Sequence, residues 1–116
     1  EAFALVAKAR PDARLTIGTD MGNPWIAPGI SLHREIQLLS EAGVPNARLL
    51  LAATRHAAEA LGAGQRLGQI APGFEADLLV LDADPLEDIR HTRDIHAVVL
   101  DGVLITPAAL NRLKGE

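Results

Sequence analysis

A short apolar stretch that ends at a carboxylate constrains this chain more than any other feature. Residues 15–20 read Leu-Thr-Ile-Gly-Thr-Asp, and residues 14–19 are predicted to form a buried strand because the run is too short for a helix. Helical patterns lie on both sides of it. A strand between helices that ends at an acid is how α/β enzymes present a catalytic or metal-binding carboxylate, here Asp20. Gly-Thr-Asp is also an ordinary turn, so Asp20 capping the next loop stays an alternative.

The segment after this acid is predicted to be a loop. Gly, Asn and Pro recur through residues 21–30, which is typical of turns. Trp25 and Ile26 lie within it, where a bulky apolar pair either lines a pocket or tucks under the loop. The two interpretations have equal support from the sequence.

Helical patterns occupy most of the remaining first half. Residues 1–10 have helical periodicity and good helix-forming residues. Ser31 is expected to cap a second helix that ends at Gly43. Pro45 suits the first position of a third helix, which is expected to continue to Gly62.

The second half has the pattern of strands and turns. Residues 76–81 are apolar and predict a strand, and residues 85–92 predict a loop or a short helical turn. Two apolar runs within residues 97–105 flank Asp-Gly at positions 101–102, which predicts a hairpin with a type I′ turn. Residues 107–116 predict a short helix or a frayed end.

Composition excludes several classes of protein. The chain has 116 residues, 48% of them hydrophobic, a net charge of −4 and three aromatic side chains, so neither disorder nor nucleic-acid binding is expected. The absence of cysteine excludes disulfides and thiolate metal sites, and no apolar run is long enough to span a membrane. The chain begins with Glu1 rather than Met, which suggests a fragment or a processed piece. The compartment stays open, with a cytoplasmic location favoured.

Three sequence segments together resemble one family. The chain looks like the C-terminal portion of a metal-dependent amidohydrolase. Its sequence pattern most resembles those of imidazolonepropionase and Xaa-Pro dipeptidase-like members. The segments are Ile-Gly-Thr-Asp at 17–20 with Gly-Asn-Pro at 22–24, the helical residues 32–43 with Ala-Ala-Thr-Arg-His-Ala-Ala at 52–58, and Leu-Gly-Gln-Ile-Ala-Pro-Gly-Phe-Glu-Ala-Asp-Leu at 67–78 with its continuation to residue 102.

The resemblance implies an α/β fold. Residues 1–62 would be the end of a (β/α)8 barrel, comprising a helix, strand 8 and the last helices. Residues 63–116 would be the C-terminal part of a small composite β-sandwich built from both chain ends. The function implied is hydrolysis of a C–N bond in an amide, cyclic amide or dipeptide, by metal-activated water. The partners implied are a small-molecule substrate and an upstream barrel segment, without which the chain is expected to be inactive; self-association stays open.

The resemblance also implies roles for particular residues. In the family, the Asp that ends strand 8 binds the metal and moves a proton, and Asp20 matches that position. The expected cofactor is a divalent metal, zinc first, as one or two ions held mostly by residues outside this chain. Asn23, Trp25 and His33 are the predicted substrate-binding residues.

Departures from the family pattern keep a rival interpretation open. The family's His-x-His pair is absent, and the four histidines here form no such pair. His56 is expected to pack within a helix or lie on its surface, while His91 and His96 are expected to be solvated. One carboxylate cannot hold a zinc that needs three or four protein ligands. The alternative is a non-catalytic α+β binding or scaffold module that has lost its metal site.

Overall fold

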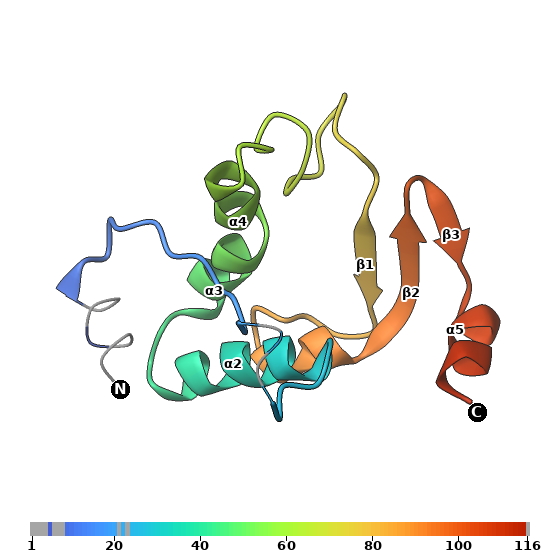
Figure 1. Ribbon diagram of the computed structural model, residues 1–116, viewed down its shortest axis with the longest axis horizontal. Coiled ribbons are helices and arrows are strands. Elements are labelled where there is room, and N and C mark those ends of the chain that lie inside the picture. The colour runs from blue at the N-terminus through green and yellow to red at the C-terminus, as the bar shows by residue number, and fades with distance from the viewer. Residues whose placement is uncertain (1–4, 6–8, 21, 23, 116) are drawn as a thin grey trace.

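The protein has a helical region and a sheet region that lie side by side (Figure 1). The computed structural model describes residues 5, 9–20, 22 and 24–115. Its radius of gyration is 15.0 Å, whereas a compact domain of this length has roughly 13 Å. The chain is therefore more open than an ordinary domain of its size. None of the helices formed by the described residues has the length and apolar character needed to cross a bilayer.

Helix α2 spans Ile30–Glu41 and begins without a side-chain cap. The predicted cap at Ser31 is wrong, because Gly29 takes a φ of 76° and turns the chain directly into the helix. Backbone carbonyls before the helix accept the first N–H groups instead. The predicted end is confirmed: Gly43 has a φ of 89°, and its N–H and that of Val44 bond back to Ser40 and Leu39, as in a Schellman motif.

The third predicted helix is divided into two. Helix α3 spans Asn46–Ala53 and helix α4 spans Arg55–Ala60. Between them Thr54 has φ −122° and ψ −90°, outside the helical region. Its hydroxyl donates to the Leu50 carbonyl oxygen at 2.7 Å, a local bond that competes with the regular ladder and bends helices. The prediction of one continuous helix to Gly62 is therefore wrong. The helix is interrupted at Thr54, and Pro45, expected at the first helical position, is instead the N-cap of α3.

The segment before Asp20 is held by helix side chains rather than by a sheet. Residues 14–19 have no strand pairing within the described part of the chain, so the predicted strand is not observed there. Arg48 of α3 donates to the carbonyl oxygens of Arg10 and Ala13, just before this segment, at 2.7 and 2.8 Å. His56 of α4 lies 3.2 Å from the Leu15 carbonyl oxygen through Nδ1. Side-chain bonds thus take the place of a strand ladder.

The second half forms a three-stranded antiparallel sheet in the order β1-β2-β3. Strand β1 spans Leu78–Leu81, β2 spans Ile95–Leu100 and β3 spans Val103–Ile105. A 3-10 helix, η1 at Ile89–Arg93, precedes β2, and helix α5 at Pro107–Lys114 follows β3. These elements confirm the predicted strand, short helical turn, hairpin and C-terminal helix.

The hairpin turn matches its prediction in detail. Asp101 has a φ of 50° and Gly102 a φ of 75°, and positive φ at both central residues is what a type I′ turn requires. The Asp77 carboxylate accepts the Asp101 N–H at 2.8 Å. This bond ties the segment before β1 to the turn.

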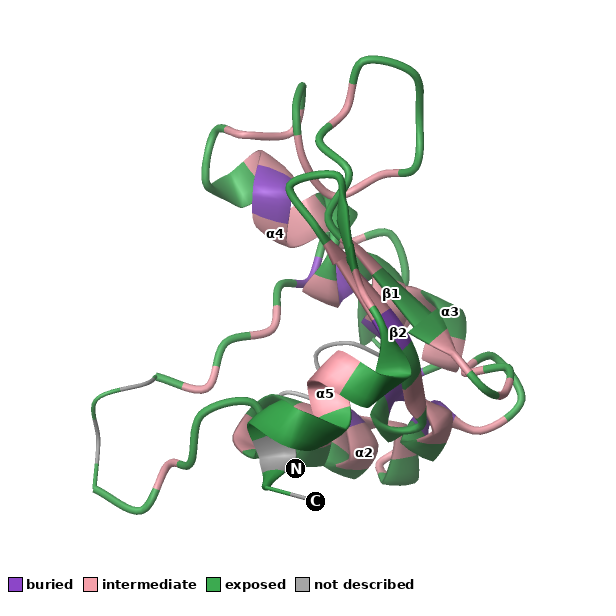
Figure 2. Ribbon diagram, turned by 90° about the vertical axis from the view of Figure 1, so that its right-hand side faces the viewer, coloured by how far each residue is buried: buried purple, intermediate pink, exposed green. Residues whose placement is uncertain are grey.

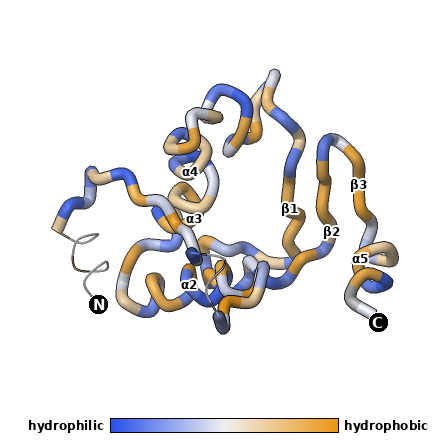
Figure 3. Tube along the Cα trace, in the orientation of Figure 1, coloured by the Kyte–Doolittle hydropathy of each residue, from blue (hydrophilic) through white to orange (hydrophobic). Residues whose placement is uncertain are grey.

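Burial is concentrated in the helical region. Figure 2 shows the sheet largely exposed or half-buried, while Figure 3 shows its strands to be hydrophobic. Only Ala97 is buried among the strand residues. Ile89 of η1 joins the core between the two regions. The core cluster consists of Leu15, Ile36, Val44, Leu49, Ala52 and Ile89.

Candidate functional site

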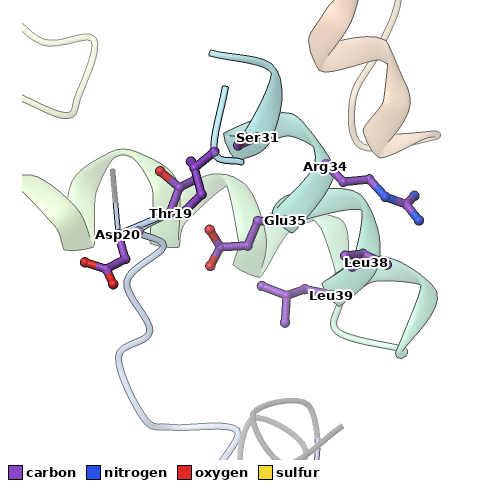
Figure 4. A pocket seen from close by; sticks show the side chains of 9 residues that line it. Thr19, Asp20, Ser31, Arg34, Glu35, Leu38 and Leu39 are labelled. Atoms are coloured by element: carbon purple, nitrogen blue, oxygen red, sulfur yellow. The ribbon is translucent and has the colours of Figure 1, made fainter. Parts of the chain in front are cut away.

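A pocket of about 460 Å³ lies between α2 and the segment that ends at Asp20 (Figure 4). Residues 18–20 form one wall, and residues from one face of α2 form the other. Ile26 of the intervening loop closes part of it. Its lining residues are Gly18, Thr19, Asp20, Ile26, Ser31, Arg34, Glu35, Leu38 and Leu39.

The catalytic and metal-binding roles expected of Asp20 stay predictions. Asp20 is exposed and lines the pocket, and its φ of 52° is left-handed. Aspartate tolerates this conformation better than most residues, and such backbone outliers cluster at functional sites. The conformation turns the chain at the point where the carboxylate meets solvent.

Glu35 is a second acid of this pocket, and the sequence reasoning missed it. It lines the pocket together with Gly18, which lies on the opposite wall. Its Oε2 is buried and has no hydrogen-bond partner among the described residues. Burial raises the pKa of the Glu35 carboxyl above its ordinary value, and the nearby Gly18 backbone N–H lowers it by a smaller amount. The helical period could have revealed this residue, because position 35 shares the face of positions 31, 38 and 39.

His33 lies outside the set of residues that line the pocket. Its Nδ1 is 3.0 Å from the Thr92 hydroxyl oxygen, which itself donates to the Ile89 carbonyl at 2.8 Å. Since the Thr92 proton is already used, the His33 Nδ1 is the donor in this pair. Burial, with a smaller effect from Arg93, lowers the pKa of His33. The described contacts join α2 to η1, and the predicted substrate contact of His33 stays a prediction.

The residues of the predicted loop differ in their positions relative to the pocket. Trp25 is fully exposed, at 101% of its reference area, with a φ of 78°. Its neighbour Ile26 is half-buried and lines the pocket. Asn23 lies outside the described residues. Substrate contacts of Trp25 and Asn23 therefore stay predictions.

The described residues offer one candidate ligand for a metal rather than a complete site. Within 9–20, 22 and 24–115, no three His, Asp or Glu side chains come close enough to hold an ion. Zinc, the expected ion, needs three or four protein ligands. Asp20, exposed at the pocket, has suitable oxygen donors for one of those positions. The remaining ligands would have to come from outside the described residues.

The amino-acid sequence of both regions is similar to that of known proteins. Residues 3–105 match the amidohydrolase family. The chain belongs to this family. The amidohydrolase chain is 32% identical over 102 residues to imidazolonepropionase from Photorhabdus laumondii, an alignment that covers 84% of this chain and 24% of that protein.

Solved structures share the fold. An Xaa-Pro dipeptidase matches 90% of this chain with a TM-score of 0.78 and 28% identity. Molinate hydrolase matches 88% of it with a TM-score of 0.72 and 30% identity. The amidohydrolase chain spans about a quarter of the length of each of these relatives.

Proposed function

We propose that this chain is the C-terminal segment of a metal-dependent hydrolase that cleaves C–N bonds in small amides, cyclic amides or dipeptides. Residues 1–62 would complete a (β/α)8 barrel and residues 63–116 would supply part of a composite β-sandwich. The single observation that carries the proposal is Asp20, held in a left-handed conformation at a pocket. The resemblance to the family implies that this is the position of its catalytic acid. The names of the relatives, an imidazolonepropionase and an Xaa-Pro dipeptidase, support the substrate class.

Asp20 would have two roles in this reaction. Its carboxylate would be one ligand of a divalent metal, for which zinc is the expected ion. Such an ion, when bound, supplies water that is deprotonated near neutral pH. Asp20 would then take a proton from the attacking water and deliver it to the leaving nitrogen. Since the other ligands are not among the described residues, activity would need the upstream barrel.

The test is Asp20→Asn in the complete enzyme that contains this segment, assayed with saturating zinc on 4-imidazolone-5-propanoate and on methionyl-proline. Removal of a general acid–base is expected to lower kcat roughly 10²- to 10⁴-fold. The matched control is Asp12→Asn, which removes an acid of the same segment that is 76% exposed and pairs only loosely with Arg10. Unchanged turnover in Asp20→Asn, or an intact protein without bound metal, would favour the non-catalytic scaffold.

A further inference from the structure

The Asp-Gly pair of the β2–β3 turn can react with itself. Because glycine has no side chain to hinder the approach, the Gly102 nitrogen can attack the carboxyl carbon of Asp101. A bond from that nitrogen to Asp101 Cγ forms, and the amide proton leaves with the carboxyl hydroxyl as water. The resulting five-membered succinimide then takes up water again. Addition at Cγ restores aspartate, whereas addition at the main-chain carbonyl gives isoaspartate, in which the chain runs through Cβ and Cγ.

The turn is exposed to water but is held at both of its central N–H groups. Asp101 and Gly102 are exposed. The Asp101 N–H donates to the Asp77 carboxylate at 2.8 Å, and the Gly102 N–H donates to the Ala76 carbonyl oxygen at 3.1 Å. Both acceptors lie immediately before β1, whose start Figure 1 shows at the same end of the sheet as the turn. The chain entering β1 therefore fixes the reactive peptide from outside the hairpin.

This fixed conformation opposes the reaction. Ring closure needs Asp101 Cβ and the Gly102 nitrogen eclipsed about the Asp101 Cα–C bond, and the backbone torsions of a type I′ turn keep them apart. Rotation about that bond would also turn the Gly102 N–H away from the Ala76 oxygen. The attack therefore has to wait for local opening of the turn.

We infer that the Asp101–Gly102 peptide is a site of isoaspartate formation, and that the Asp77 carboxylate suppresses the reaction by holding the turn. The modification would matter for the sheet. Isoaspartate lengthens the backbone of the turn, which at present joins β2 to β3 so that Leu100 faces Val103. Because turn length fixes the register of a hairpin, the modified chain would lose this pairing.

Variants at position 77 test the role of the carboxylate. Asp77→Ala removes the acceptor, whereas Asp77→Asn keeps an oxygen that can accept the Asp101 N–H. The matched control is Asp82→Ala, which removes an exposed acid that pairs with His96 beyond the other end of β1. All are made in the complete protein that contains this segment and are incubated at neutral pH. Isoaspartate is quantified in the tryptic peptide 94–112, and a synthetic peptide of the same sequence gives the rate without the fold.

The wild-type protein is expected to form isoaspartate at position 101 roughly 10-fold or more slowly than the free peptide, because the turn has to open first. Asp77→Ala is expected to raise the wild-type rate roughly 2- to 10-fold, since one hydrogen bond of the turn is lost. Asp77→Asn and Asp82→Ala are expected to stay near the wild-type rate. Hydrogen exchange of β2 and β3 should stay slow in Asp77→Ala, because only the turn opens.

Three results would overturn the inference. One is a wild-type rate equal to that of the free peptide. Another is an equal rate in Asp77→Ala and Asp82→Ala, or an equal rise in Asp77→Ala and Asp77→Asn, since the acceptor oxygen would then not be what holds the turn. The third is fast hydrogen exchange throughout the sheet of Asp77→Ala, because the faster chemistry would then come from general unfolding.

Discussion

The helical and sheet regions differ in the burial and in the strand pairing of their short apolar segments. The helical region buries Leu15 at 6% exposure, yet residues 14–19 have no strand partner in the described part of the chain. The sheet region pairs all its strands, yet Leu104 of β3 is 58% exposed. Strands β2 and β3 pair across a two-residue turn, and β1 pairs with β2 across a longer connection that contains η1. Burial follows from helices that close over a shared core, and neither property implies the other.

The two regions are expected to differ most in how much stability they lose when a leucine side chain is truncated to alanine. Leu49→Ala should lower the free energy of unfolding by about 2–5 kcal/mol, because Leu49 is fully buried and its loss leaves a cavity. Leu104→Ala should change it by less than about 1 kcal/mol, since most of that side chain is already in water. Urea unfolding of both variants measures this contrast. Equal losses would show that the exposed sheet face is covered in solution.

Backbone strain gives a second, smaller contrast. Gly68 has a φ of 86°, and an added Cβ would lie 2.9 Å from the Ala58 Cβ, the Arg55 Cα and the Thr54 carbonyl oxygen. Gly102 has a φ of 75° with nothing within 4 Å. Gly102→Ala should therefore cost about 1 kcal/mol of conformational strain alone.

Gly68→Ala adds overlap with helix backbone and should cost about 2–3 kcal/mol in total. Thermal unfolding of the two variants separates crowding from strain, because the strain is common to both. A Gly68→Ala variant no less stable than Gly102→Ala would show that the loop over α4 moves away at little cost.

These contrasts explain how far sequence reasoning could reach. The Asp101-Gly102 hairpin and the α2 terminus at Gly43 were predictable because each depends on residues within one turn of chain. Glu35 was missed because it lines the pocket together with residues 18–20, which the fold brings to α2 from another segment of the chain. The same limit applies to the strand expected at residues 14–19, which needs a neighbour to pair with.

The helix break at Thr54 was missed for a different reason. A threonine hydroxyl can bond the carbonyl four residues earlier in any helix, so the sequence alone does not say where this bond displaces the ladder. Ser31 was assigned as a cap from residue preference, while the backbone of Gly29 made a cap unnecessary. Local preferences fail where glycine or a competing side-chain bond gives the chain another way to satisfy its backbone.

A third prediction concerns the side-chain ties that replace a strand ladder. Arg48 donates to the carbonyl oxygens of Arg10 and Ala13. Arg48→Met should cost about 1–2 kcal/mol, because it leaves those acceptors without their donor. Arg14→Met, which breaks the ion pair between Arg14 and Glu59, should cost about 0.5 kcal/mol or less because Arg14 is mostly exposed.

Urea unfolding measures both losses, and hydrogen exchange of the peptide covering residues 9–20 shows where they arise. Faster exchange confined to Arg48→Met would support the view that helix side chains hold this segment. Equal exchange in the two variants would mean that burial of Leu15 holds it instead.

The smallest expected effect is at the junction of the two regions, where His33 of α2 donates to Thr92 of η1. Burial and then Arg93 lower the pKa of His33 in the folded state, so the unfolded chain binds a proton more readily as pH falls below 6.5. This contribution to stability is present above that pH and is lost as pH falls through the lower, folded pKa. His33 is only partly buried, so the expected loss in Tm from pH 7 to pH 5 is at most about 3 °C. His33→Gln keeps a donor for Thr92 but does not titrate, so its Tm should fall less over the same pH range. If the Tm of this variant depends on pH as in the wild type, protonation of His33 does not affect the stability of the junction.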